Sequence, residues 1–205
     1  MTGRSQIVLV LVLSASTNAC SGPSVAPAGV SARLASAGIC VKRMMREPDG
    51  TYLFDPSESE VSDLSVLKRI PVSSLDIHKT EMEDLSPLEE MPVRSLVACK
   101  SKVRDLDPLK RMPLQTLKVS HTQVRGLSPL REAPLKTLWI HETRVTDLGP
   151  LAGMRLTEVR FSPGSITGGL EVLDQMESLI WINQLPAAVF RRRTGSTTRS
   201  VGRPR

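Results

Sequence analysis

The chain has 205 residues, a length that suits one domain with a tail at either end and excludes a multi-domain enzyme. Its aromatic residues are two Trp, one Tyr and three Phe, so Leu, Val, Ile, Met and Ala must fill any core. The 27 basic and 21 acidic residues give a net charge of +6, but six arginines follow the last acidic residue, Glu177. The chain before them is neutral, and an argument toward nucleic acid applies only to this tail.

The chain begins with a segment that has the order of an export signal. Arg4 precedes seven consecutive apolar residues, 7–13, and small polar residues follow them up to Ala19. Seven apolar residues are too few to cross a bilayer core of ~30 Å, but they fit the apolar region of a signal peptide. We therefore expect a removable signal peptide over 1–19 and a tether rich in small residues and Pro over 20–38.

Cys20 follows Ala19 directly and precedes a stretch of small residues, so the segment resembles a bacterial lipoprotein signal. In that family the Cys is lipidated and becomes the mature N-terminus, which implies a membrane anchor on Cys20 and a place in the cell envelope. Two alternatives remain open: plain secretion, and a cytosolic protein in which the apolar run is a buried first strand.

The next segment, 39–60, is predicted to be an N-terminal capping hairpin. The turn residues Pro48-Asp49-Gly50 separate the apolar runs 39–41 and 52–54. The alternative for this segment is an amphipathic helix through Val30, Leu34, Val41 and Met45.

Five units of 21 residues fill 61–165 without insertion or deletion. The segment Val61–Leu67 recurs as Met82–Leu88, and further copies begin at Val103, Val124 and Val145. Apolar residues recur at unit positions 1, 4, 7, 10, 12, 15 and 17, counted from Val61 as position 1. Positions 14 to 18 alternate between apolar and polar residues, which predicts a strand.

This pattern resembles the leucine-rich-repeat family, in its internalin-like bacterial branch. The resemblance implies an α/β fold, a leucine-rich-repeat solenoid or horseshoe with a parallel β-sheet on its concave face and short 3-10 or helical turns on its convex face. Stacked units share one core, because no unit can bury its apolar face alone. Where the family usually has Asn, this chain has hydroxyl residues that can still bond neighbouring backbone: Thr80, Ser101, Thr122 and Thr143.

Side-chain oxygens and Pro mark the start of the convex turn in three of the units. Ser86, Asp107 and Ser128 each precede a Pro, so we expect them to cap the turn while Pro occupies its first position. Aspartates also recur at unit position 3, where we expect a structural role in the turn rather than a calcium ladder: Asp63, Asp84, Asp105 and Asp147.

The repeats are followed by a degenerate closing unit over 166–186 and a basic tail over 187–205. The tail contains six arginines and no acid, so we expect it to be disordered. It could contact anionic lipid or nucleic acid by charge, but a solvated end is the simpler interpretation, and nucleic acid is not expected as a partner.

The outward positions of the strands define a candidate binding face. Trp139 is the most informative residue, because a large aromatic side chain has no packing reason to lie outside a Leu core. Lys118 and Arg160 flank it one unit away on either side. The functional hypothesis is a binding patch; the alternative is a single exposed Trp stacked on Arg160. The predicted face also includes Val97, His141 and His78.

Catalytic and metal-binding motifs are missing from the sequence. It has no phosphate loop, nucleophile elbow or paired-His zinc helix, and its three cysteines lack metal-site spacing. His78 beside Cys99 could form a metal or nucleophile site, but the simpler interpretation is that they are two solvated polar side chains on neighbouring strands. No cofactor is expected. Whether Cys40 and Cys99 form a disulfide is left open by the sequence.

The sequence therefore predicts a non-catalytic protein-binding module, exported to the cell envelope or secreted, with a protein ligand and a glycan as the less favoured partner. The alternative is a cytosolic adaptor or regulatory protein, similar to repeats attached to Ser/Thr kinases. An enzyme that uses His78 and Cys99 is a third hypothesis, from a different class.

Overall fold

The computed structural model describes residues 34, 39, 41–68 and 70–193. The predicted signal peptide over 1–19, the lipidation site Cys20, Cys40 and the end of the tail lie outside these residues. Nearly all of the predicted tether also lies outside them. In the described part, no helix is long and apolar enough to cross a membrane.

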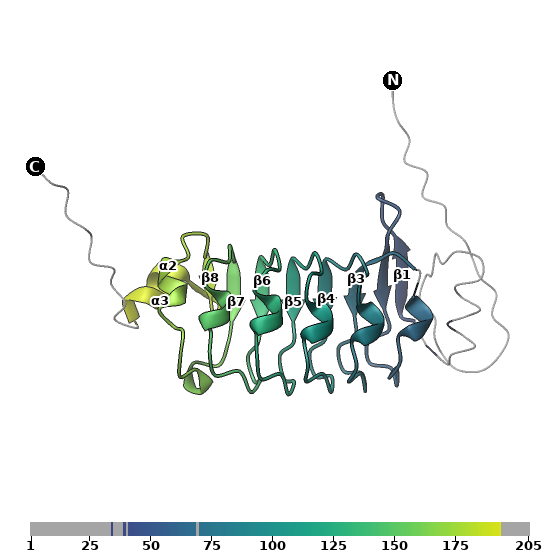
Figure 1. Cartoon of the computed structure of the whole chain (residues 1–205), viewed down its shortest axis with the longest axis horizontal. Helices are drawn as coiled ribbons and strands as arrows, with labels where there is room; N and C mark the ends of the chain where they lie inside the picture. The colour runs from purple at the N-terminus through teal and green to yellow at the C-terminus, as the bar shows by residue number, and fades with distance from the viewer. Residues whose placement is uncertain (1–33, 35–38, 40, 69, 194–205) are drawn as a thin grey trace, which may run out of the picture.

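A single sheet runs the length of the described chain, and its strands follow one another in sequence order (Figure 1). The pairs from β2 to β8 are parallel, and the first and last pairs are antiparallel. The strands are β1 (Arg43–Arg46), β2 (Tyr52–Asp55), β3 (Val72–Asp76), β4 (Ser95–Val97), β5 (Thr116–Lys118), β6 (Thr137–Trp139), β7 (Glu158–Arg160), β8 (Trp181–Ile182) and β9 (Leu185–Pro186).

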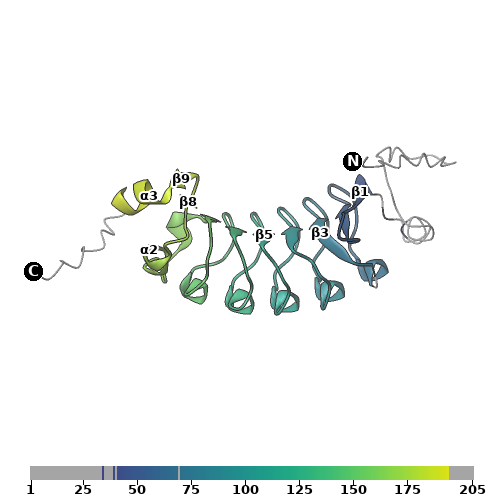
Figure 2. The same ribbon diagram turned by 90° about the horizontal axis from the view of Figure 1, so that it is seen from above.

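Short turns return the chain from one strand to the next, and the stack curves so that the strands line its inner side (Figure 2). The 3-10 turns of the five units are η1 (Ser65–Leu67), η2 (Ser86–Leu88), η3 (Asp107–Leu109), η4 (Ser128–Leu130) and η5 (Gly149–Leu151). A sixth turn, η6 (Pro163–Ser165), follows β7, and α2 (Val172–Gln175) and α3 (Ala187–Arg193) lie in the C-terminal part. The predicted solenoid, with its parallel concave sheet and convex turns, is confirmed.

The strand register is 21 residues, as the repeat predicts. Leu75, Leu96 and Leu117 pair in turn, and each is fully buried. Together with the other inward residues they form one continuous core. Burial of an apolar side chain contributes roughly 1.5–3 kcal/mol, so the stacking of equivalent leucines supplies the main stabilisation that one unit alone lacks.

Backbone hydrogen bonds continue between units beyond the short strands, because the residue at position 19 adopts a left-handed conformation. Lys79, Lys100 and His121 have φ of 53°, 58° and 58°. Their N–H groups donate to the position-18 carbonyls of the next unit at 2.8, 2.9 and 3.0 Å. The hydrogen bond thus compensates a conformation that is costly for a residue with a Cβ atom.

The convex turns are capped by the aspartates of position 3, not by the residue before Pro as we expected. Asp84 Oδ1 accepts the N–H of Ser86 at 2.8 Å, and Asp105 Oδ1 accepts the N–H of Asp107 at 2.9 Å. The Ser86 side chain makes no cap and instead donates to Asp84 at 2.7 Å. The expectation was wrong because a side chain two residues before the turn reaches the first free N–H, in the geometry of an Asx turn.

The hydroxyl column bonds its own unit. Thr80, Ser101 and Thr122 each donate to the carbonyl three residues earlier, at 2.7, 2.7 and 2.6 Å. A hydroxyl has one donor, whereas the Asn amide that the family uses has two. The hydroxyl side chains therefore make hydrogen bonds within their own unit, and the hydrogen bonds between units are made by backbone groups.

The N-terminal end of the sheet is a hairpin, with the turn at Pro48–Gly50 between β1 and β2. Its first strand is β1, and the described ends of the predicted apolar run, Ile39 and Val41, are not part of a strand. Met45 lies in β1, so the alternative of an amphipathic helix is wrong at this residue. The position of the strand is set by pairing with β2, which no local hydrophobic pattern reveals.

The C-terminal end is closed by the β8–β9 hairpin and by α3. The prediction of a disordered tail from Ala187 onward is wrong for 187–193, which form this helix. The Arg191 guanidinium donates to the carbonyl oxygens of Leu173 and Met176 at 2.9 and 2.8 Å. Composition alone predicted disorder, but these bonds and a buried Ala187 fix the helix on the last unit.

The fourth unit has Gly126 where the other units have the capping aspartate, which leads to a stability prediction. Gly126 is exposed, and an added Cβ atom would meet no heavy atom within 4 Å. We expect Gly126→Asp to raise the free energy of unfolding by about 1 kcal/mol more than Gly126→Ala, because only Asp can accept the Ser128 N–H. Urea denaturation of both variants measures this difference, and equal stability of the two would contradict the role of the cap.

Candidate binding face

The concave face carries the columns of side chains that the repeat predicts. Ser74, Ser95, Thr116, Thr137 and Glu158 pair in order along one column; Asp76, Val97, Lys118, Trp139 and Arg160 pair along the next. Strands in a sheet lie ~4.8 Å apart, so each side chain contacts its equivalents in the units before and after it.

Trp139 is held between two cations. The Lys118 Nζ atom lies 3.9 Å from the centroid of the ring, and the Arg160 Cζ atom lies 3.8 Å from it. Lys118 and Arg160 belong to the strands on either side of β6, so the two cations approach from opposite sides. The stacked contact of the alternative interpretation is therefore present, and Lys118 adds a second cation–π contact.

Glu158 fixes the orientation of this cluster. Its Oε1 atom accepts the indole N–H of Trp139 at 3.2 Å and the Arg160 Nε–H at 2.7 Å. The Trp139 ring is half-buried, and its polar atom is already bonded. A rotamer fixed in this way costs little further ordering entropy when a partner binds.

His141, two residues after the end of β6, also belongs to this cluster. Its Nδ1 atom lies 2.9 Å from the Ser120 Oγ atom, and its ring lies 6.4 Å from the Trp139 ring and 5.3 Å from the His121 ring. Burial lowers the pKa of His141, and the nearby His121 and Arg160 lower it further, against the opposing effect of Glu142. At neutral pH the imidazole is therefore uncharged.

Trp181 belongs to the same face but was missed by the sequence analysis. It pairs with Glu158 across β7 and β8 and is 45% exposed. It lies 23 residues after Glu158, because the closing unit is two residues longer than the repeat. Periodicity therefore could not assign it to a column.

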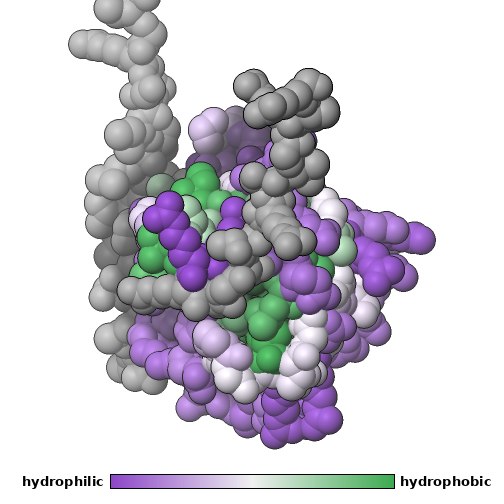
Figure 3. Space-filling model, turned by 90° about the vertical axis from the view of Figure 1, so that its left-hand side faces the viewer, coloured by the Kyte–Doolittle hydropathy of each residue, from purple (hydrophilic) through white to green (hydrophobic). Residues whose placement is uncertain are grey.

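The C-terminal end of the molecule exposes apolar surface (Figure 3). The described residues include five exposed large apolar side chains, and four of them lie here: Leu170, Ile180, Trp181 and Val189.

His78, at the other end of the face, is part of an ionic cluster. Its Nδ1 atom lies 2.7 Å from Asp76 Oδ1, and its Nε2 atom lies 3.6 Å from Glu58 Oε1. Glu58 is a residue that the sequence analysis did not identify. Its hydrogen bonds to Lys42 and Lys79 lower its pKa to about 2, so Glu58 is an anion between two cations at neutral pH.

Cys99 and Val97 occupy the middle of the face and are half-buried. Burial raises the pKa of the Cys99 thiol, which is the opposite of what a nucleophile or a metal ligand needs. In the described part of the chain, no group of three or more His, Cys, Asp or Glu side chains could hold a metal ion.

The position of His141 leads to a prediction about its titration. We expect its pKa in the folded protein to lie below the ordinary value of 6.5. Arg160→Ala should raise it, because a nearby cation is removed, and Glu142→Gln should lower it, because a nearby anion is removed. Titration of the imidazole signals by nuclear magnetic resonance measures these shifts. A pKa at or above 6.5 in the unmodified protein would refute the described environment.

Comparisons with known proteins support the fold. No protein-family model and no curated protein matches the chain. Two internalins from Listeria monocytogenes are similar in structure. Internalin C2 has a TM-score of 0.58 and 24% identity, over 62% of this chain and 58% of the internalin. The internalin inlF has a TM-score of 0.53 and 21% identity, over 63% of this chain and 46% of the internalin. The chain thus spans about half the length of these structures, and the likeness shows a leucine-rich-repeat solenoid.

Proposed function

We propose that this protein is a non-catalytic binding module that holds a protein ligand on its concave face around Trp139. The observation that carries this proposal is the clamped indole ring of Trp139, with Trp181 exposed on the same face. Trp and Arg are the residues most enriched at the energetic centres of protein interfaces. A solenoid offers such residues on an extended curved surface rather than in a closed pocket.

The chemistry of the cluster favours a protein over a glycan. Both faces of the Trp139 ring are occupied by cations, so its edge and the cations themselves are what a ligand meets. Lys118 makes no ion pair with any described residue, while Arg160 is paired with Glu158. A ligand with an acidic group near an apolar side chain would pair with Lys118 and cover Trp181.

An enzymatic role through His78 and Cys99 has little support. The imidazole is engaged by Asp76 and Glu58, and the thiol is stabilised in its protonated form. The likeness to two internalins is evidence for the fold alone.

The proposal includes export, with a lipid on Cys20 as the anchor. Its support comes from the apolar run, the small residues before Cys20 and the tether after it. The concave face would then present its ligand site outside the cytoplasm.

The Trp139→Ala variant tests the binding face. We expect it to weaken ligand binding by about 2 kcal/mol or more, the range of a central interface residue, without a change in thermal unfolding. The immobilised chain is incubated with extracytoplasmic proteins, bound proteins are identified, and the dissociation constant of a purified hit is measured. Glu132→Ala, outside the concave face, is the matched control. Equal binding by Trp139→Ala would refute the proposed face.

The N-terminal peptide of the native protein tests the location. Mass spectrometry after separation of membrane, soluble and external fractions should find a lipid-modified Cys20 as the first residue, in the membrane fraction. An unmodified N-terminus in the external fraction would replace the anchor by plain secretion. An intact N-terminus in the soluble fraction would contradict export and favour the cytosolic adaptor.

A further inference from the structure

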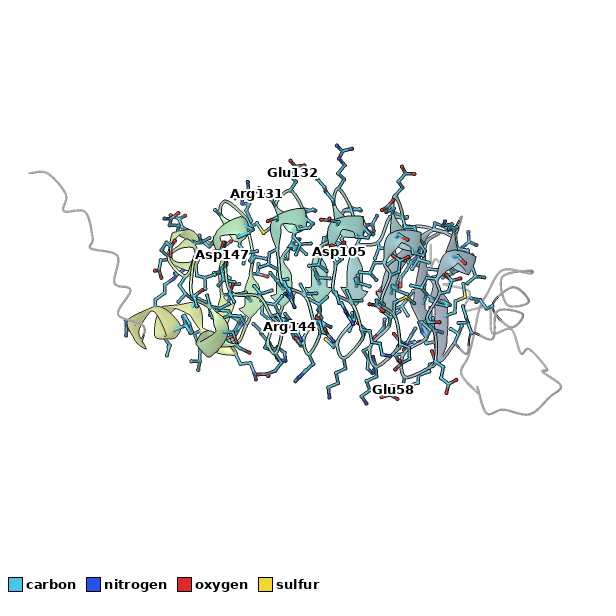
Figure 4. The ribbon with its side chains drawn as sticks, turned by 60° about the horizontal axis from the view of Figure 1, so that its bottom comes forward. Glu58, Asp105, Arg131, Glu132, Arg144 and Asp147 are labelled. Carbon is cyan, nitrogen blue, oxygen red and sulfur yellow. The ribbon has the colours of Figure 1, made fainter. Side chains whose placement is uncertain are left out.

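Pairs of like charges mark one long side of the solenoid, at unit positions 8 and 9. The second unit has Glu89 and Glu90, and the third has Lys110 and Arg111. Figure 4 labels the equivalent residues of the fourth unit, Arg131 and Glu132, which project from this side, while Glu58 and Arg144 project from the other. We call the surface formed by Glu89, Glu90, Lys110 and Arg111 the charged edge.

The four side chains of the charged edge are exposed and form no ion pair with one another or with any other described residue. The opposite long side behaves differently. There Lys102 pairs with Glu81, and Arg104 lies 3.3 Å from Glu83, each across adjacent units. The spacing between units thus permits pairing, yet the charges of the charged edge remain free for a partner.

Two shallow hollows with mixed polar and apolar linings accompany these charges. One, of about 570 Å³, lies between the second and third units, where Met91 and Met112 are buried beneath the exposed Pro92 and Pro113. A second hollow, of about 770 Å³, lies between the first and second units and shares Met91 and Pro92. The charged edge therefore combines apolar surface with a border of unpaired charge, as interfaces between proteins do.

The order of these four charges is complementary to itself, whereas the flanking Lys68 and Arg131, also at unit position 8, would be like charges that face each other across the axis. A two-fold axis that passes between the second and third units reverses the order of the units in the second copy. It places Glu89 opposite the partner's Lys110 and Glu90 opposite the partner's Arg111, and the symmetry repeats both pairs. We propose that the occupant of the charged edge is a second copy of this chain, in antiparallel orientation.

The size of the surface sets the strength of this dimer. The charged edge involves two to three units, which span roughly 10–15 Å at the strand spacing. Interfaces below about 1,200 Å² belong to weak and transient complexes. The dimer therefore forms at micromolar concentrations, dissociates at high salt, and leaves the concave face uncovered.

Charge reversal tests the proposed dimer, because two oppositely reversed variants should restore dimer formation when they are mixed. One variant carries Glu89→Lys and Glu90→Lys, so that both units are basic; a second carries Lys110→Glu and Arg111→Glu, so that both are acidic. Each alone should dimerise at least about 10-fold more weakly than the unmodified protein, because like charges now face one another. An equimolar mixture should form a heterodimer, because the four charges of the charged edge on each copy again face opposite charges. The double reversal Glu60→Lys and Glu177→Lys, away from the charged edge, is the control for the net charge of the first variant.

The measurement is sedimentation equilibrium of the full chain at about 100 μM and low salt, where a micromolar dimer is populated. We expect the unmodified protein and the control to dimerise, each reversed variant to dissociate at least about 10-fold more readily, and the mixture to recover the unmodified behaviour. A monomeric unmodified protein would overturn the proposal. So would reversed variants that dimerise normally, or a mixture of folded variants, checked by circular dichroism, that stays monomeric.

Discussion

The backbone hydrogen bonds that join each 21-residue unit to the next are the constraint on which the other features depend. They extend past the three-residue strands because position 19 adopts a left-handed conformation and directs its N–H to the next unit, as Lys100 does toward Ser120. Equivalent side chains are consequently fixed ~4.8 Å apart. The neighbours of any repeat residue are then found by adding or subtracting 21.

This spacing is close to the distance at which a cation contacts an aromatic ring or a carboxylate. The residue types that follow one another in a column therefore decide which contacts form between adjacent units. In one column, Lys118, Trp139 and Arg160 become a stacked clamp. In another, Glu81 and Lys102 form an ion pair. Exposed pairs of this kind contribute ~0–1 kcal/mol each, so they influence recognition more than stability, which comes from the buried leucines.

The fold and the central cluster could be predicted from the sequence because both follow from periodicity. The positions of Lys118 and Arg160 beside Trp139 needed only the period of 21. Features that depend on local geometry or on the ends of the array could not be predicted in this way. The capping role of Asp84 depends on the reach of a side chain, and β1 depends on pairing with β2.

The missed residues lie where the period fails. Trp181 is displaced by the two extra residues of the closing unit, and α3 is fixed by the bonds of Arg191 to carbonyl groups in α2 and just after it. Glu58 precedes the first clear unit, although it occupies position 19 of the hairpin unit before it. Extending the count backward by one unit would have placed it beside Lys79.

A dimer through the charged edge would change how the concave face acts. None of the four residues of the charged edge lies on the concave face, so the Trp139 cluster of each copy would remain accessible to a ligand. A ligand with two equivalent sites, or an array of ligands on a surface, would then bind the second face intramolecularly, at an effective concentration set by the geometry of the pair. Two weak contacts, one between copies and one on each concave face, would together hold a partner more tightly than either contact alone. The same repeat that stacks the units would in this way also set the distance between two binding sites.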